Sequence, residues 1–188
     1  MKEIEILVEV YDDIDAVKDA LKKYKYIGLK HTIDEYYYDP KRDTLKPDKN
    51  NQLSHCLRLR NVNGEYSITY KDDVFDNDKW LYSNEYETEI GSVLMLREIF
   101  KRLGLKKFIE IDNKKEAYQS DKYDIVLEDV KDLGIFMEVE YCTNDDVDVI
   151  AIKKEIQDFI DSLNINVSKE LNIGKPEMYL RKFDIKIK

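Results

Sequence analysis

The stretch EIEILVEV, residues 3–10, alternates charged and apolar side chains with a period of two. That is the period of a β-strand, in which successive side chains point to opposite faces of the sheet. One face is continuously apolar, whereas the face that carries Glu3, Glu5 and Glu9 is interrupted by Leu7. The stretch therefore predicts a strand whose two faces meet different surroundings, one of them rich in carboxylates.

Four further segments repeat this pattern of one apolar and one charged face. The charged faces consist of Arg58 and Arg60, of Thr69 and Lys71, of Glu85, Glu87 and Glu89, and of Glu138 and Glu140. For a single strand, the simplest interpretation is a solvated sheet face on which charges pair across strands. Taken together, the strands must also cover the apolar stripes of the predicted helices, which turns their charged faces toward one another. About eight strands can close into a barrel with a polar interior.

The remaining elements follow from periodicity and turn residues. Further strands are predicted at residues 31–39, 81–90, 106–119, 123–130 and 135–143, with a hairpin over 55–71 that turns at Asn63-Gly64. Helices are predicted at 12–24, at 92–105 with an end at Gly104, and at 144–165 with an N-cap near Asn144. Residues 41–52 and 72–80 are predicted loops, and 175–188 fit a short helix or an edge strand. The predicted fold class is α+β, an eight-stranded antiparallel β-barrel with helices packed on the outside.

Length and charge narrow the function. We expect 188 residues to form a single domain, 1–188. A net charge of −9 argues against nucleic acid as a partner. The sequence has no signal peptide and no apolar run long enough to span a membrane, so we expect a cytoplasmic protein without a membrane partner. Cys56 and Cys142 lack CxxC spacing, which favours reduced thiols and leaves one disulfide as the alternative.

The residue types on the charged faces suit a polyphosphate. The side chains of Arg58, Arg60 and Lys71 are donors for phosphate oxygens. Carboxylates are hard oxygen ligands for Mg²⁺ or Mn²⁺, and the candidates are Glu3, Glu5, Glu138 and Glu140. Glu85 and Glu87 could either reach the metal or pair with arginine. Without a cation, such a cluster of carboxylates would repel itself and raise its own pKa values.

Five segments carry motifs that occur together in one known family. They are EIEIL at 3–7, DEYYYDPKRD at 34–43, CLRLR with ITYK at 56–60 and 68–71, EYETEI at 85–90 before a helix ending in RLG, and LEDVKDLGIFMEVEY at 127–141. In this order and spacing they resemble the CYTH superfamily, also called triphosphate tunnel metalloenzymes. The second segment is similar to the class IV adenylyl cyclase-like branch. The resemblance implies an eight-stranded tunnel that holds a triphosphate on Arg58, Arg60 and Lys71 and a divalent metal on the four glutamates.

Three positions depart from the family pattern. Leu7 stands where the opening strand usually has lysine, and Ser83 stands where a basic residue is usual. A later Lys-x-Arg pair falls on Asn113 and Lys115, so that Lys115 is the remaining phosphate ligand on that strand. The carboxylate row of residues 3–10 thus fits metal ligands, and Leu7 marks a site that has drifted from the family.

The resemblance leaves three functions open. The leading one is adenylyl cyclase-like, in which the ribose 3′-hydroxyl of ATP attacks the α-phosphorus, giving cyclic AMP and pyrophosphate. The second is hydrolysis of inorganic or thiamine triphosphate, in which water attacks the terminal phosphorus. The third is a non-catalytic protein that binds a polyphosphate or nucleotide, which the missing cations favour. Because related tunnels often pair, a homodimer is an alternative to a monomer.

Overall fold

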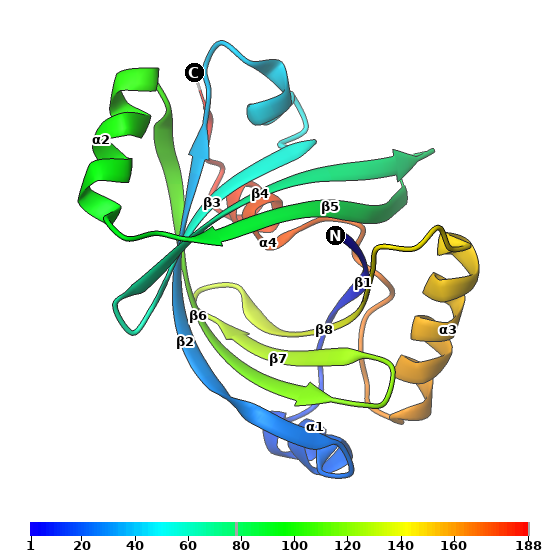
Figure 1. Cartoon of the computed structure of the whole chain (residues 1–188). Coiled ribbons are helices and arrows are strands. Elements are labelled where there is room, and N and C mark those ends of the chain that lie inside the picture. The colour runs from blue at the N-terminus through cyan, green and yellow to red at the C-terminus, as the bar shows by residue number, and fades with distance from the viewer. Residues whose placement is uncertain (78, 188) are drawn as a thin grey trace.

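The strands of alternating character form a closed antiparallel barrel in a computed structural model that describes residues 1–77 and 79–187. The strands are β1 (Lys2–Glu9), β2 (Lys25–Tyr38), β3 (His55–Val62), β4 (Glu65–Asp76), β5 (Lys79–Glu89), β6 (Lys106–Gln119), β7 (Asp124–Val130) and β8 (Gly134–Thr143). Around the barrel they follow the order β1-β5-β4-β3-β2-β6-β7-β8 (Figure 1). The predicted fold class is therefore confirmed.

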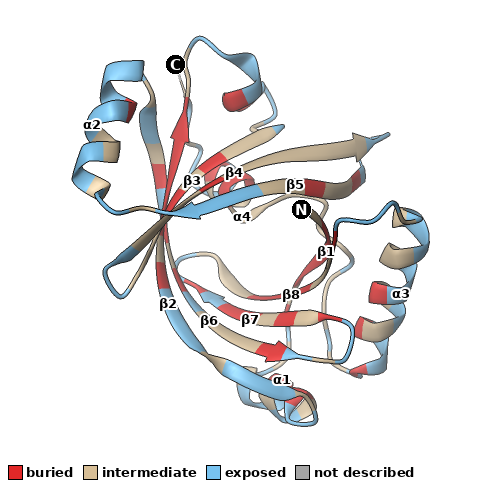
Figure 2. Cartoon of the chain, in the orientation of Figure 1, coloured by how far each residue is buried: buried red, intermediate tan, exposed pale blue. Residues whose placement is uncertain are grey.

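Three helices lie outside the ring of strands: α1 (Ile14–Leu21), α2 (Val93–Leu103) and α3 (Val149–Ser162) (Figure 1). The apolar faces of β1, β7 and β8 pack with α1 and α3 in the largest core cluster, which includes Ile6 and Ile156. A second cluster packs α2 on β2 and β3 through Phe100 and Leu59. Figure 2 shows buried residues, in red, on these strands and on α3. Covering the apolar faces from outside leaves the charged faces to the interior.

One seam of the barrel is short. β1 pairs with β5 only at Lys2↔Asn84 and Glu3↔Ser83. Beyond these pairs, the segment 166–171 bonds to β1 instead: the amide of Ser168 donates to the carbonyl of Glu9 (2.8 Å), and the amide of Leu171 donates to the carbonyl of Leu7 (3.0 Å). The chain after α3 thus takes the place that β5 leaves, and it leads directly to one end of the barrel.

That end is closed by α4 (Lys175–Lys182). A short 3₁₀ turn, Asp43–Leu45, lies in the loop between β2 and β3. Leu180 of α4 is fully buried against an apolar cluster that includes Leu7, Tyr36, Ile111 and Phe136. Leu7 therefore belongs to the apolar floor of the barrel interior, which explains why it interrupts the row of glutamates on β1.

Several predicted boundaries were wrong. The predicted loop 72–80 is largely strand, because β4 continues to Asp76 and β5 begins at Lys79; residue 78 lies outside the described residues. The strand predicted from residue 31 begins at Lys25, since β2 pairs with β6 along its whole length. The N-cap predicted near Asn144 is Asp148, whose carboxylate accepts bonds from the amides of Ile150 and Ala151.

Other boundaries agree with the sequence. α2 is capped by Ser92 and ends at Gly104, which has a left-handed φ of 85°. Of the two alternatives for the tail, a helix is present over 175–182, with Pro176 in its first turn; the last residue, 188, is outside the described part. Within residues 1–77 and 79–187, no helix is both long and apolar enough to cross a membrane.

Candidate active site

The charged side chains predicted from the sequence meet in the barrel interior. A cavity of about 820 Å³ is lined by Arg58, Arg60, Lys71, Lys115, Glu3, Glu85, Glu87, Glu138 and Glu140. This volume lies within the usual range of small-molecule sites. A narrower cavity of about 80 Å³ toward α4 is lined by Glu5, Leu7 and Lys175, and the two cavities share Arg58, Lys71, Lys115 and Glu138. Together they form one continuous charged tunnel.

At the α4 end the carboxylates are matched by cations. Glu128 is fully buried and lies 2.6 Å from the amine of Lys115 and 2.7 Å from that of Lys175, which also lies 2.6 Å from Glu138. Burial by itself disfavours the charged forms, but Lys175 and Lys115 hold the pKa of Glu138 well below its ordinary range, and the same two lysines lower the pKa of Glu128. Both carboxylates are therefore ionised and paired.

Lys175 is a tunnel residue that sequence reasoning missed. It is the first residue of α4, and its amine reaches Glu138, which stands directly opposite Leu7 in the β1–β8 ladder. A cation thus reaches the part of the tunnel where the family pattern has the lysine that is Leu7 here. No local signal could have found it, because the position of α4 depends on the segment that fills the β1–β5 seam.

The arginines differ in how far they are committed to protein partners. Arg60 makes a two-pronged ion pair with Asp34 at 2.8 and 2.7 Å, which keeps the pKa of Asp34 at about 2 despite its burial. Arg58 lies 3.5 Å from Glu85 and donates to Thr69 at 3.0 Å. Within the described residues, its buried Nε atom has no hydrogen-bond partner. Arg58 therefore keeps a donor for a ligand inside the tunnel.

Lys71 lies between two carboxylates. Its amine contacts Glu3 and lies 2.9 Å from Glu85. For Glu85, burial is outweighed by Lys71, by a hydrogen bond from Glu3 and by Arg58, which brings the pKa to about 2. For Glu3, burial outweighs Lys71 and raises the pKa. One lysine thus neutralises Glu85 and leaves Glu3 only partly compensated.

Two carboxylates on β1 and β8, those of Glu5 and Glu140, have no ion-pair partner among residues 1–77 and 79–187. Glu5 is 5% exposed, and within the described residues its buried Oε2 atom has no hydrogen-bond partner. Burial, with Glu138 nearby, raises the pKa of Glu5 well above its ordinary value. Burial and the charge of Glu138 likewise raise the pKa of Glu140 to about 9. In the absence of a metal these groups hold protons, as predicted for a carboxylate cluster without its cation.

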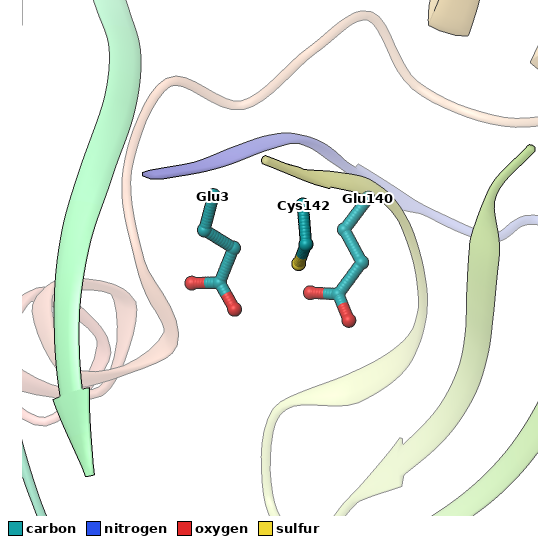
Figure 3. Close-up of side chains that lie close together, drawn as sticks. All are labelled: Glu3, Glu140 and Cys142. Carbon is teal, nitrogen blue, oxygen red and sulfur yellow. The ribbon is translucent and has the colours of Figure 1, made fainter. Parts of the chain in front are cut away.

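The same side of the tunnel fits a divalent cation. Glu5, Glu138 and Glu140 each offer an oxygen within 4.8 Å of the others, and Glu3, Glu140 and Cys142 form an adjoining group with the same spacing. Figure 3 shows the second group, with the sulfur of Cys142 between the carboxylates of Glu3 and Glu140. A bound cation would pair with the buried Oε2 atom of Glu5 and would lower the raised pKa values of Glu5 and Glu140. The oxygen-rich donor set suits Mg²⁺ or Mn²⁺.

Two of the departures from the family pattern have local partners. Ser83, in place of a cation, is buried and donates to Asp73 at 2.6 Å. Asn113 is also buried and donates to Glu128 at 3.0 Å. These neutral donors satisfy acids without adding charge, so the tunnel has fewer cations than the family pattern implies but no obvious vacancy at these two positions.

The structure thus brings every site residue predicted from the sequence into one tunnel. These residues differ in whether they form an ion pair with another side chain of the protein. Arg60, Lys115 and Glu138 are held in ion pairs, whereas Glu5 and Glu140 form none with the residues that the structure describes. Glu87, at the wide end, accepts a bond from Thr69 at 2.6 Å and lies 3.4 Å from Arg58. Asp34, Glu128 and Lys175 complete the set of charges.

Comparison with known proteins gives the same family from sequence and from fold. The CYTH domain family matches residues 1–171. A protein of Methanocaldococcus jannaschii named "putative adenylate cyclase" is 32% identical over 183 residues, which cover 96% of this chain and 99% of that protein. A solved structure from Pyrococcus horikoshii OT3 has a TM-score of 0.78 at 25% identity and covers 95% of this chain and 99% of the other.

A more distant structure shows how far the fold extends. A "putative adenylyl cyclase" from Hippeastrum, described as having a dominant triphosphatase activity, has a TM-score of 0.65 at 14% identity, covering 98% of this chain and 97% of the other. At this identity the likeness concerns the fold alone. The family match and the M. jannaschii relative, which both extend over nearly all of the sequence, place this chain in the CYTH domain family.

Proposed function

We propose that the tunnel binds a nucleoside or other organic triphosphate together with Mg²⁺ or Mn²⁺, and that its leading activity is class IV adenylyl cyclase-like conversion of ATP to cyclic AMP and pyrophosphate. The observation that carries the proposal is that two tunnel-lining residues of opposite charge each have a buried atom without a hydrogen-bond partner in the described part of the chain, the Oε2 acceptor of Glu5 and the Nε donor of Arg58. A cation would satisfy the oxygen of Glu5, and an anion would satisfy the N–H of Arg58. A metal–triphosphate complex supplies both.

The chain's own residues have separate tasks in this proposal. Arg58, Lys71 and Lys115 neutralise phosphate oxygens where the two cavities meet, and Arg60 does so on the wall of the wide cavity. Glu3, Glu5, Glu138 and Glu140 would hold the divalent ion, which when bound supplies further neutralisation of the phosphate charge. Fixed ion pairs such as Asp34–Arg60 hold the donors in place before the ligand arrives.

In the cyclase reaction the 3′-oxygen forms a bond to the α-phosphorus as the bond to pyrophosphate breaks. The hydroxyl proton passes to water in this step, and Arg58 and Lys71 would neutralise the negative charge that accumulates on pyrophosphate. In a triphosphatase, water replaces the hydroxyl as the nucleophile and attacks the terminal phosphorus. The same cations serve both reactions, so product analysis, rather than binding, has to separate them.

A non-catalytic polyphosphate-binding protein is the second candidate, and a specific observation favours it. Several tunnel cations are already paired with carboxylates: Arg60 with Asp34, Lys115 with Glu128, and Lys175 with Glu128 and Glu138. Cations that are committed to protein partners are less available for a transition state. A protein of this kind would bind a triphosphate and release it unchanged.

The first experiment is thermal unfolding with tripolyphosphate or ATP, with and without Mg²⁺ or Mn²⁺. A ligand at about 100 times its Kd stabilises the folded state by ~2.7 kcal/mol, which raises the Tm by several degrees. Assays for cyclic AMP, pyrophosphate and phosphate then identify the reaction. Glu5→Gln should abolish the metal-dependent shift, whereas Glu110→Gln, an exposed carboxylate on β6, should leave it unchanged. A cooperative transition that ignores millimolar ligand and metal contradicts the proposal.

A further inference from the structure

A further cavity lies on the outer surface of the barrel. It is bordered by the turn after α1, the β6–β7 turn and α3, and its volume is about 430 Å³ (Figure 1). This volume is within the usual range of small-molecule sites. The lining residues that matter here are Lys23, Tyr24, Lys25, Lys122, Tyr123 and Phe159. Because these six residues line neither cavity of the tunnel, the proposed function leaves this cavity unused.

Three aromatic side chains line this cavity as a continuous row. The ring centroid of Phe159 lies 5.5 Å from that of Tyr24 and 5.0 Å from that of Tyr123. Tyr123 is buried in the largest core cluster, whereas Tyr24 and Phe159 pack against that cluster and stay partly exposed. The core thus holds the rings in place, and the exposed parts of Tyr24 and Phe159 offer a surface on which another flat ring can stack.

Lysines stand at both ends of this aromatic row. The amine of Lys23 lies 5.2 Å from the ring centre of Tyr24, and the amine of Lys122 lies 5.5 Å from the ring centre of Tyr123. Lys25, the first residue of β2, adds a third amine to the lining. The cavity therefore combines an aromatic surface with several cations.

The positive charges of the cavity are only partly balanced by acids. Lys122 contacts Glu155, whereas Lys23 and Lys25 form no ion pair with any residue in 1–77 or 79–187. Among the described residues that line the cavity, the acid is Asp121. Three amines against one lining carboxylate leave a local positive excess on a protein whose net charge is −9. An anion bound between Lys23 and Lys25 would offset this excess.

We propose that this outer cavity binds a nucleoside monophosphate, with its base on the rings of Tyr24 and Phe159 and its phosphate on Lys23 and Lys25. The two halves of such a ligand match the two features that the cavity combines. Any base can stack on an aromatic ring, and a phosphate with a charge of about −2 at neutral pH is suited to more than one amine. The inference goes beyond the proposed function, because it uses none of the residues assigned to triphosphate or metal.

The first test measures the affinity of the full chain for AMP by equilibrium dialysis, with a chelator present and no divalent metal. Wild-type protein should bind one equivalent of AMP. The double variant Lys23→Gln/Lys25→Gln should bind it ~10–100-fold more weakly, because two charge-assisted contacts are lost. The matched control is Lys101→Gln/Lys169→Gln, which removes two charges at exposed positions outside the described cavities and should bind AMP as the wild type does.

The second test separates the two halves of the ligand on wild-type protein. Adenosine lacks the phosphate and ribose 5-phosphate lacks the base, so each should bind at least ~10-fold more weakly than AMP. Tyr24→Leu keeps an apolar side chain but removes one ring. It should weaken AMP ~5–100-fold and leave the weaker affinity for ribose 5-phosphate unchanged. If this variant fails to fold, the comparison of AMP with ribose 5-phosphate decides the role of the rings.

The outcomes are distinct from those that test the proposed function. Equal affinity of the wild type and of Lys23→Gln/Lys25→Gln for AMP means that the nucleotide binds elsewhere, and it overturns the outer site. A wild type that does not bind millimolar AMP also overturns it, even if tripolyphosphate raises the Tm with Mg²⁺. Ribose 5-phosphate that binds as tightly as AMP overturns the nucleotide assignment, because the aromatic row then contributes nothing.

Discussion

The cluster of buried carboxylates in the tunnel has a paired end, Glu128 and Glu138, and an unpaired end, Glu5 and Glu140, and the charges of the two are balanced in opposite ways. Toward α4, Glu128 and Glu138 are paired with Lys115 and Lys175, and their pKa values are lowered. In the described part of the chain Glu5 and Glu140 have no such partners, and their pKa values are raised. The difference shows which acids serve the structure and which are kept for a ligand. A sequence pattern of alternating glutamates does not distinguish the two groups.

The comparison predicts its largest effect at the paired end. Glu128→Gln leaves Lys115 without its close carboxylate and removes one of the two that Lys175 contacts. Breaking a buried pair in this way should lower the free energy of unfolding by ~3–5 kcal/mol. Urea denaturation at pH 7 measures it, with Glu110→Gln as the control expected to stay within ~0.5 kcal/mol. A loss below ~1 kcal/mol would show that the paired end does not depend on these charges.

At the unpaired end the same chemical change should act in the opposite direction. Glu5→Gln removes a buried acid that has no cation, so the metal-free protein should be as stable as the wild type or slightly more stable. The variant should lose the metal-induced stabilisation, which at 100 times the Kd amounts to ~2.7 kcal/mol in the wild type. Thermal unfolding with and without Mn²⁺ measures both effects. A variant that is destabilised without metal but still responds to it would reverse the assignment of the two ends.

The unpaired end should also set the pH dependence. Burial raises the pKa of Glu140 to about 9, from an ordinary value of 4.5 in the unfolded chain. Between these values the folded state holds more protons, so the free energy of unfolding should fall as pH rises, by up to ~1.4 kcal/mol per pH unit for one proton. Glu177, with a pKa raised by burial to about 7, acts in the same direction below neutrality.

Metal should remove this dependence, because a bound cation takes the place of the proton. We expect the Tm of metal-free protein to decrease from pH 6 to pH 9, and the slope to be much smaller with saturating Mn²⁺. Glu140→Gln should flatten the metal-free profile, since the amide does not titrate. A Tm that increases with pH over this range in metal-free protein would be incompatible with unpaired carboxylates.

The smallest effect concerns the exchange of cations at the paired end. Lys175→Met removes the amine that lies 2.6 Å from Glu138, and Leu7→Lys adds one on the residue opposite Glu138. If position 7 and Lys175 serve the same carboxylate, the double variant should be more stable than the sum of the single changes implies, by ~0.5–3 kcal/mol. Denaturant titration of the four proteins measures this coupling. Strict additivity would mean that the two positions are independent.

The fold could be predicted because its decisive signal is local. A period of two in residues 3–10, repeated around Arg58 and Glu138, specifies strands with one apolar face, and the helices that need this face determine which side is turned inward. The set of tunnel residues follows from the same alternation. The family motifs add the order of the strands.

The partition of charges could not be predicted, because it depends on contacts between distant segments. Lys175 reaches Glu138 only because residues 166–171 bond along β1 where β5 diverges, and nothing near residue 175 indicates this path. Glu128 looked like part of a strand motif and is the most deeply buried acid of the tunnel, at 0% exposure. The segment 72–80 was misjudged for a simpler reason: its many aspartates are typical of a loop, whereas its backbone continues the β4–β5 pairing as far as Asp76↔Lys79.

The short β1–β5 seam also determines the order in which the protein can be completed during its synthesis. β1 precedes the other seven strands in the chain, whereas the segment that fills the seam and α4 follow all eight of them. Until these residues have left the ribosome, the barrel has no floor, and Glu128 and Glu138 lack the amine of Lys175. The charges of the interior can therefore be balanced only after the segment 166–182 is available to the strands that precede it.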